Sequence, residues 1–336
     1  MIPAAYAEKL DNKRVKCRLC PAECLLTEGK YGICGARFNK QGRLMVENFG
    51  ELVSAAYDPI EKKPLFHFYP GSIIFSTGAN GCNFNCDNCQ NWQISQQQVP
   101  TQYVSPEDLV GLAGDRGSIG VAYTYSEPMI WFEYILRAGH LVHEAGLKNV
   151  LVSNGYINPE PLKELLPLID AANIDLKSMD PEFYKKVCKG RLEPVLENIA
   201  AFYRAGVRLE ITNLVITDLN DTDQDFELLV DFVAGLSNDI PLHFSAYYPS
   251  YKMKNPPTKI DRLMKAYDLA SKKLNYVYLG NARLPGRENT ICPKCGTKLI
   301  NRDGYHIEIL SLTAGKCDEC GLDTGIPMLP LAKSFN

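Results

Sequence analysis

A loop with three closely spaced cysteines is the feature that most restricts how this 336-residue chain can fold. Cys82, Cys86 and Cys89 follow directly on a hydrophobic run at residues 72–77. Three thiolates on one short loop can hold three irons of a cubic 4Fe–4S cluster and leave the fourth iron without a protein ligand. Structural zinc normally has four protein ligands, so zinc completed by a distant histidine fits less well, as does simple burial of the thiols. We therefore interpret the loop as a catalytic metal site.

Short β-rich runs alternate with helical patterns from residue 72 to about residue 280. One helix start is residues 105–108, where a serine precedes a proline and two acids. The alternation is typical of a parallel sheet covered by helices. Six β/α units are fewer than the eight of a closed barrel, so we predict an α/β fold with a partial (βα)6 TIM barrel. The predicted strands are 73–77, 119–124, 148–153, 172–176, 207–214 and 240–246, with an edge strand at 276–279.

The spacing C-x3-C-x2-C is that of the radical S-adenosylmethionine (radical SAM) superfamily, which this loop resembles closely. The flanking segments 57–65 (YDPIEKKPL), 67–71 (HFYPG) and 90–95 (QNWQIS) narrow the resemblance. They look like the AmmeMemoRadiSam system radical SAM enzymes, which are relatives of the pyruvate formate-lyase activating enzymes. The resemblance covers nearly the whole chain. One position departs from it: the residue before the last cysteine is usually an aromatic residue that packs on the SAM adenine, and here it is Asn88.

The resemblance also implies which residues hold SAM. Glu127 stands in the run Tyr125-Ser126-Glu127-Pro128, where the family usually has Gly-Gly-Glu-Pro, and a carboxylate there can accept hydrogen bonds from the SAM amino group. A small polar turn follows the third predicted strand, and an acid and a lysine follow the fourth. A histidine on the sixth strand is a weaker candidate. We assign no catalytic residue; the predicted SAM contacts are Glu127, Ser153, Asn154, Asp175, Lys177 and His243.

Four of these residues also have an ordinary structural explanation. Glu127 fits an acid at the start of a helix, and Asp175 fits a cap at the end of a strand. Lys177 fits a solvated surface charge, and a lone histidine in a strand, such as His243, is more often a hydrogen-bonded core residue. The position of these residues at the expected strand ends is what favours the cofactor interpretation.

Both ends of the chain are rich in cysteine. Two C-x2-C knuckles near the end are each followed by glycine and are separated by twenty-one residues, just beyond zinc-ribbon spacing. We predict zinc at Cys292, Cys295, Cys317 and Cys320. Four cysteines near the start predict zinc or an auxiliary 4Fe–4S cluster, with free thiols as the alternative, at Cys17, Cys20, Cys24 and Cys34. The predicted domains are therefore 1–55 (metal-binding region), 56–284 (partial barrel) and 285–336 (zinc-ribbon-like).

Composition limits the class of protein. The formal net charge of −3 and the absence of a basic stretch argue against a nucleic-acid partner. No apolar stretch reaches membrane-spanning length, and the first residues do not resemble a signal peptide. Twelve cysteines without a secretory signal indicate metals instead of disulfides, so we expect a cytoplasmic protein. Cys188, alone on a helical pattern, is interpreted as a packing residue.

The resemblance implies a radical SAM oxidoreductase. A reduced 4Fe–4S cluster would cleave SAM to a 5′-deoxyadenosyl radical, which would abstract hydrogen from a protein or small-molecule substrate. The implied partners are an electron donor such as flavodoxin or ferredoxin, and Memo-type and AMMECR-type proteins. One alternative is an activase of a glycyl radical enzyme. A second is a non-catalytic scaffold or electron carrier with several metal sites, which would be indifferent to SAM. The weakest is an RNA-modifying enzyme, which would bind RNA in a salt-sensitive way.

Overall fold

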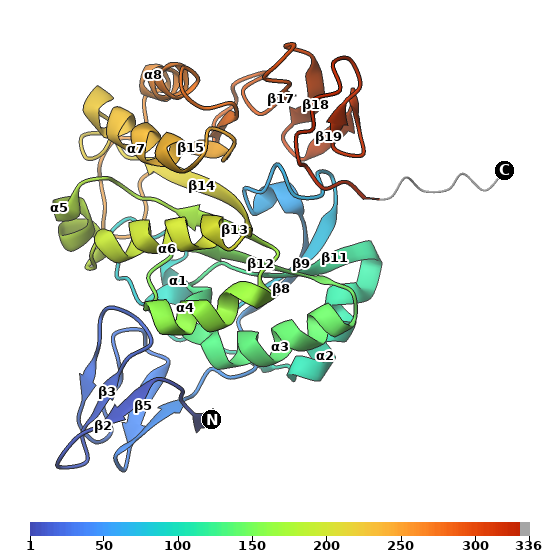
Figure 1. Ribbon diagram of the computed structural model, residues 1–336. Coiled ribbons are helices and arrows are strands. Elements are labelled where there is room, and N and C mark those ends of the chain that lie inside the picture. Colours follow the sequence, from blue (N-terminus) through green and yellow to red (C-terminus); the bar gives the residue numbers. More distant parts are fainter. Residues whose placement is uncertain (330–336) are drawn as a thin grey trace.

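An eight-stranded sheet forms the centre of the computed structural model, which describes residues 1–329 (Figure 1). Seven strands run parallel, and β8 pairs antiparallel with β9 at one edge. Within the described residues the edge strands β8 and β16 do not pair, so the barrel stays open as predicted. In spatial order the strands are β8 (Ser54–Pro59), β9 (Ile73–Gly78), β11 (Ser118–Tyr123), β12 (Lys148–Ser153), β13 (Ala171–Asp175), β14 (Arg208–Val215), β15 (Leu242–Ala246) and β16 (Val277–Gly280).

Helices cover the outer face of this sheet (Figure 1). Phe226 on α7, for example, packs edge-on against Phe244 on β15. Ser105 caps α2 by accepting a hydrogen bond from the Asp108 amide, as its sequence predicts. The longer helices are α2 (Pro106–Gly114), α3 (Phe132–Glu144), α4 (Pro159–Leu165), α6 (Glu193–Arg204), α7 (Asp223–Leu236) and α8 (Ile260–Ala270). The short ones are α1 (Trp92–Ser95), α5 (Pro181–Phe183), the 3-10 turns η1 (Ile60–Lys62), η2 (Asp115–Gly117), η3 (Pro128–Trp131) and η4 (Leu166–Leu168), and the π-helical turn η5 (Tyr184–Cys188).

The inner, concave face of the sheet is partly open to solvent. Side chains alternate between the faces of a strand, so registered neighbours share a face. Asp175 lies opposite Thr212, and Leu214 lies opposite Ser245, which places all four on the concave face with Val152. All five are partly exposed although their strands lie inside the sheet. The concave face toward the carboxyl ends of the strands is therefore the natural place for a ligand.

The segment between β8 and β9 closes the opposite end of the barrel. Ile60, Leu65 and Phe68 pack with side chains of the concave face to form a small apolar cluster. The His67 amide donates a hydrogen bond of 2.7 Å to the buried Glu210 carboxylate. This segment, which carries the motif at residues 57–71, is thus a floor beneath the concave face.

Small sheets precede and follow the barrel. The N-terminal ones are joined to α3 by an ion pair in which Arg37 Nη2 lies 2.7 Å from both carboxylate oxygens of Glu133. The C-terminal ones are joined to the barrel floor by Arg302, which donates a hydrogen bond of 2.8 Å to the Phe66 carbonyl. Their strands are β1 (Ile2–Pro3), β2 (Ala7–Lys9), β3 (Val15–Cys17), β4 (Leu25–Leu26), β5 (Arg37–Lys40), β6 (Arg43–Val46), β7 (Glu51–Leu52), β10 (Gln102–Tyr103), β17 (Thr290–Ile291), β18 (Lys298–Asp303), β19 (His306–Ile309), β20 (Leu312–Thr313) and β21 (Lys316–Cys317).

The predicted domain boundaries at 55/56 and 284/285 stay predictions, and residues 330–336 of the third domain lie outside the described residues. Between residues 1 and 329, no helix combines the length and the apolar character needed to cross a membrane.

Candidate metal and cofactor site

The three-cysteine loop begins where β9 ends, at the carboxyl edge of the sheet. Gly81 precedes Cys82 with φ of +105°, a conformation that glycine favours. A Cβ at Gly81 would lie 2.2 Å from the Cys34 carbonyl oxygen. The N-terminal cysteine-rich region therefore packs directly against the base of this loop.

Hydrogen-bond donors surround the sulfur atoms of the loop. The Phe84 amide lies 3.4 Å from Cys82 Sγ, and Asn154 Nδ2 lies 3.8 Å from the same sulfur. Ser95 Oγ lies 3.0 Å from Cys89 Sγ. Burial raises the pKa of the thiols of Cys82 and Cys89, so a bound metal would supply the positive charge that favours their thiolates. Thiolates that receive hydrogen bonds are the ligands that an iron–sulfur cluster requires, so the loop fits one.

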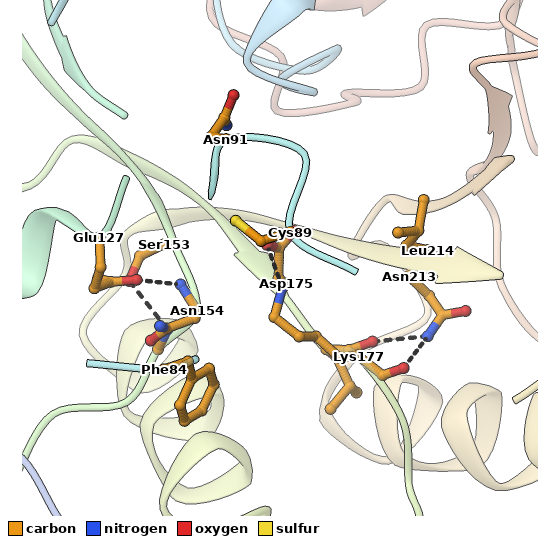
Figure 2. A network of polar contacts seen from close by, with 12 residues as sticks. Phe84, Cys89, Asn91, Glu127, Ser153, Asn154, Asp175, Lys177, Asn213 and Leu214 are labelled. Atoms are coloured by element: carbon orange, nitrogen blue, oxygen red, sulfur yellow. Dashed lines mark hydrogen bonds and ion pairs between the residues drawn. The ribbon is translucent and has the colours of Figure 1, made fainter. Parts of the chain in front are cut away.

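Glu127 links the ends of two strands (Figure 2). Its carboxylate is buried and accepts hydrogen bonds of 2.7 Å from Ser153 Oγ, 2.8 Å from the Asn154 amide and 2.9 Å from the Met129 amide. Burial raises the pKa of Glu127 to about 7, against these hydrogen bonds, which lower it. The structure thus brings Glu127, Ser153 and Asn154 together, and Asn154 in turn reaches Cys82.

Asp175 and Lys177 form a second group at the end of β13 (Figure 2). Lys177 Nζ lies 2.8 Å from Asp175 Oδ2, and the two side chains are 20% and 39% exposed. Burial alone would lower the pKa of Lys177, but the Asp175 carboxylate and the Cys86 sulfur outweigh it and hold that pKa well above its usual value. Asn213 Nδ2 fixes the backbone by donating to the Leu176 and Lys177 carbonyls at 2.8 and 3.2 Å. The site therefore has an accessible cation beside the cysteine loop.

The backbone at Tyr125 keeps a glycine-like conformation, with φ of +70°. Its carbonyl accepts a hydrogen bond of 2.7 Å from Asn91 Nδ2, which belongs to the segment after Cys89. Its hydroxyl donates to Asp58 on the concave side at 2.6 Å. Tyr125 thus adopts a left-handed backbone conformation at a position where the family usually has glycine, while its side chain packs over Lys63 and Asp58.

Several buried polar atoms in and under this site lack a hydrogen-bond partner. In the described part of the chain they include Asn88 Oδ1 in the cysteine loop, Asn213 Oδ1, and Asn173 Oδ1 and Thr212 Oγ1 on the concave face. An unpaired buried polar atom costs about 1–3 kcal/mol, so a polar ligand that supplied partners would be stabilised here. These atoms fit a polar cofactor such as SAM.

His243 lies elsewhere. It is near the start of β15, and its Nε2 is 2.6 Å from Glu210 Oε2 in a buried group with Tyr278 and Phe66. The structure therefore places His243 at the barrel floor, away from the strand ends that carry the other predicted SAM contacts. We retain it as a core residue and not as a proposed cofactor contact.

The four C-terminal cysteines form a compact group with its own small hydrophobic core. Their sulfur atoms all lie within 4.8 Å of one another, with 3.6 Å between Cys292 and Cys320 and 3.7 Å between Cys295 and Cys317. Over residues 1–329 this is the one set of metal-binding side chains that approaches so closely. The N-terminal cysteines lie on neighbouring segments, since the Cys17 amide donates a hydrogen bond of 2.9 Å to the Cys24 carbonyl and the Ile33 amide, next to Cys34, lies 3.5 Å from Cys24 Sγ, but their sulfurs are less tightly gathered than those of the C-terminal group.

Comparison with known proteins identifies the family. Residues 77–233 match the model of the Radical SAM superfamily. An uncharacterized protein of Methanocaldococcus jannaschii is 43% identical over 331 residues, which cover 96% of this chain and 98% of that protein. This chain belongs to the radical SAM superfamily.

Further relatives share less sequence with this chain. A pyruvate formate-lyase-activating enzyme of Clostridium pasteurianum is 22% identical over 59% of this chain and 87% of its own length. Several further curated relatives are also activating enzymes. In these proteins the match covers no more than half of their own length. The crystal structure of a radical SAM methyltransferase from Sphaerobacter thermophilus superimposes with a TM-score of 0.50, at 12% identity, over 63% of this chain and 67% of the other. The last similarity supports the fold alone.

Proposed function

We propose that this protein is an AmmeMemoRadiSam-type enzyme that binds a 4Fe–4S cluster at Cys82, Cys86 and Cys89 and cleaves SAM there. One observation carries the proposal: the cysteine loop leaves β9 at the open edge of the barrel, with hydrogen-bond donors beside its sulfurs. When bound, the cluster and SAM together supply a 5′-deoxyadenosyl radical that takes a hydrogen atom from the substrate. The protein's own residues have to orient these groups and exclude water.

The residues at the strand ends have distinct proposed roles. Lys177 keeps its positive charge and binds the SAM carboxylate, while the partly exposed Asp175 orients Lys177 and is free to accept a hydrogen bond from a ribose hydroxyl. Glu127 acts through Asn154: it fixes the Asn154 backbone, so that the side-chain amide faces Cys82. The Tyr125 carbonyl, held by Asn91, is the proposed acceptor for the SAM amino group.

Asn88 takes the place of the aromatic residue that would contact adenine. Its side-chain carbonyl is buried and has no partner among the described residues, whereas adenine carries an amino group that donates hydrogen bonds. We propose that Asn88 binds adenine by this hydrogen bond and not by stacking.

The substrate is proposed to lie on the concave face, below SAM. Asn173 Oδ1 and Thr212 Oγ1 are unpaired there, so they favour a substrate with hydroxyl or amide donors. Similarity to activating enzymes supports a second candidate, hydrogen abstraction from a glycyl radical enzyme. The concave polar atoms suit either a small molecule or a peptide loop. The proposed partners remain flavodoxin or ferredoxin as reductant, with Memo-type and AMMECR-type proteins.

The outer cysteine groups are proposed to hold structural metals. The gathered sulfurs of the C-terminal group suit tetrahedral zinc. For the N-terminal group we propose zinc or a second 4Fe–4S cluster. Its contact with Gly81 gives that metal a direct structural connection to the cysteine loop.

The test is SAM binding after anaerobic reconstitution with iron and sulfide. Calorimetry should show one binding event for the wild-type protein and none for a variant with Cys82, Cys86 and Cys89 all changed to alanine. Lys177→Ala should weaken binding by about tenfold to a hundredfold, since a charge-assisted hydrogen bond contributes about 1.5–3 kcal/mol. Lys185→Ala is the matched control, because the Lys185 side chain is 75% exposed and pairs with the exposed Glu182. A reconstituted protein that ignores SAM would favour the scaffold or electron-carrier alternative.

A further inference from the structure

Tyr125 lies at the centre of a tight turn that follows β11. The Ser126 amide donates a hydrogen bond of 2.9 Å to the Thr124 carbonyl, which closes a turn of three residues. The φ of Tyr125 is +70°, and three-residue turns with a positive φ at their centre are rare and strained. A residue with a Cβ keeps such a conformation only where its surroundings hold it in place.

The backbone of this turn packs closely against the site. A Cβ at Gly78, the last residue of β9, would lie 2.3 Å from the Thr124 carbonyl oxygen. On the other side, the Tyr125 carbonyl accepts the hydrogen bond of 2.7 Å from Asn91 Nδ2. A change of the Tyr125 φ to a negative value would reorient the peptide groups on both sides of this residue, so the direction of its carbonyl depends on the left-handed turn.

The Tyr125 side chain is anchored on the concave side by a buried ion pair. Its hydroxyl donates a hydrogen bond of 2.6 Å to Asp58 Oδ2, and Lys63 Nζ lies 2.7 Å from the same oxygen. Lys63 Nζ also lies 4.5 Å from the centre of the Tyr125 ring, within the range of a cation–π interaction. The Lys63 and Asp58 side chains are 2% and 7% exposed. The ion pair therefore holds Tyr125 twice, by its hydroxyl and by its ring.

An ion pair of this kind needs an explanation beyond stability. Burial of two charges has a desolvation cost that their attraction offsets only in part, so a buried pair by itself adds little to the free energy of unfolding. Asp58 and Lys63 both lie in the motif at residues 57–65, which the cysteine loop and the strand ends do not explain. Their shared contact with a strained residue of the site gives them a function.

We propose that Asp58 and Lys63 position SAM through Tyr125: they anchor its side chain and so hold the left-handed turn whose carbonyl receives the SAM amino group. This inference rests on the proposed SAM site. Asp58 and Lys63 are positioning residues, because they act through the backbone of Tyr125. Without the anchor, only the fraction of the protein that keeps the turn binds SAM, and the apparent dissociation constant rises as that fraction falls. Glycine would need no anchor, since it adopts positive and negative φ about equally readily.

The experiment is calorimetric titration of the anaerobically reconstituted protein with SAM. Tyr125→Phe removes the hydroxyl, Tyr125→Ala removes the anchored ring but keeps the Cβ, and Tyr125→Gly removes the Cβ as well. Asp58→Asn is made in the wild-type protein and in Tyr125→Gly. Tyr57→Phe is the matched control, because it removes a hydroxyl from the adjacent residue of β8, where that hydroxyl donates to the Leu112 carbonyl on α2 at 2.9 Å. Iron and sulfide are counted in every variant, so that proteins with equal cluster content are compared.

We expect a dissociation constant about tenfold higher in Tyr125→Ala, since residues with a Cβ seldom adopt a positive φ, and an intermediate value in Tyr125→Phe. Tyr125→Gly should recover most of the affinity lost in Tyr125→Ala, although it removes more atoms. Asp58→Asn should weaken SAM binding in the wild-type background and have no further effect in Tyr125→Gly. Tyr57→Phe should bind SAM as the wild-type protein does.

Equal dissociation constants across the series at position 125 would overturn the proposal. Binding as weak in Tyr125→Gly as in Tyr125→Ala would also overturn it, because the side chain itself would then contact SAM. The same holds for an equal effect of Asp58→Asn in both backgrounds, or for a matching loss in Tyr57→Phe. If Asp58→Asn does not fold, the series at position 125 decides alone. A reconstituted wild-type protein that does not bind SAM would instead contradict the proposed function itself.

Discussion

Replacement of Arg302 by methionine is expected to be strongly destabilising, although Arg302 lies far from the cysteine loop in sequence. Its side chain is fully buried at the barrel floor, where it donates to the Phe66 carbonyl at 2.8 Å and to Thr290 Oγ1 at 2.7 Å. The guanidinium also lies 4.3 Å from the centre of the Phe66 ring and 3.9 Å from a carboxylate oxygen of Glu61. Methionine fills similar space but supplies neither the charge nor the donors.

The loss of stability in Arg302→Met follows from the buried Glu61 carboxylate that remains without its partner. Removing one partner of a buried charge pair typically costs about 3–5 kcal/mol, because the other charge remains buried without compensation. We expect that range for Arg302→Met, with a matching loss in the free energy of unfolding. Arg137→Met is the matched control: Arg137 is 63% exposed and pairs with the exposed Glu107, so we expect less than about 1 kcal/mol.

The assay is anaerobic urea unfolding of the reconstituted protein, followed by tryptophan fluorescence from the buried Trp131 and the partly exposed Trp92. The SAM dissociation constant of Arg302→Met, measured in parallel, should rise if the floor supports the concave face. An Arg302→Met midpoint within the range of the Arg137→Met control would refute the reasoning that ties the C-terminal sheets to the barrel.

Three further predictions concern other parts of the chain. Gly81→Ala should lower the free energy of unfolding by about 2 kcal/mol or more and reduce iron retention, because the new Cβ would meet the Cys34 carbonyl. The control Gly235→Ala has open space around it and should be neutral or stabilising. Urea midpoints and iron content test both variants. Burial lowers the pKa of His67 to about 3, so the unfolded chain binds the extra proton as pH falls from 6.5 toward 3. Relative to His67→Gln, wild-type stability should fall by about 2 kcal/mol between pH 7.5 and pH 5 in urea unfolding, and a constant difference would contradict the assignment. Cys317→Ser should lose the metal of the C-terminal group, measured by elemental analysis, while the cluster of the loop is retained.

The main elements of the fold could be predicted because they depend on local patterns. Apolar runs, helix caps and the position of the cysteine loop after a strand are visible within about ten residues of sequence, and the seven parallel strands appear within two residues of their predicted bounds. The edge strand β8 was not predicted. Its residues, including Ala55 and Ala56, have weak strand preference, and only its antiparallel pairing with β9 defines it.

The site was predictable to the extent that its residues stand at strand ends. Glu127 and Asn154 are brought together because β11 and β12 are neighbours in a parallel sheet. His243 was assigned to the same site because the strand that carries it was correctly predicted. Its position near the start of β15, however, places its side chain at the floor of the barrel. A strand carries residues both at the floor of the barrel and at its carboxyl end. The sequence predicts which strand a residue belongs to more clearly than where along the strand it lies.

Contacts between distant segments could not be predicted at all. The Asn85 amide donates to the Cys188 carbonyl, and Arg302 donates to the Phe66 carbonyl, which lies 236 residues away. Neither pair has a local signal, since a single cysteine on a helical pattern and an arginine in a short strand are ordinary. The packing of η5 against the cysteine loop and of the C-terminal sheets against the barrel floor is what brings these segments together.

The most direct test of the account is the formation of 5′-deoxyadenosine. The reconstituted protein is given SAM and a strong reductant under anaerobic conditions, and the product is quantified by mass spectrometry beside the variant that lacks Cys82, Cys86 and Cys89. We predict 5′-deoxyadenosine from the wild-type protein and none from the variant, with deuterium entering the product once a labelled substrate is present. A wild-type protein that holds a full cluster and binds SAM, yet forms no more 5′-deoxyadenosine than the variant, would contradict the central claim.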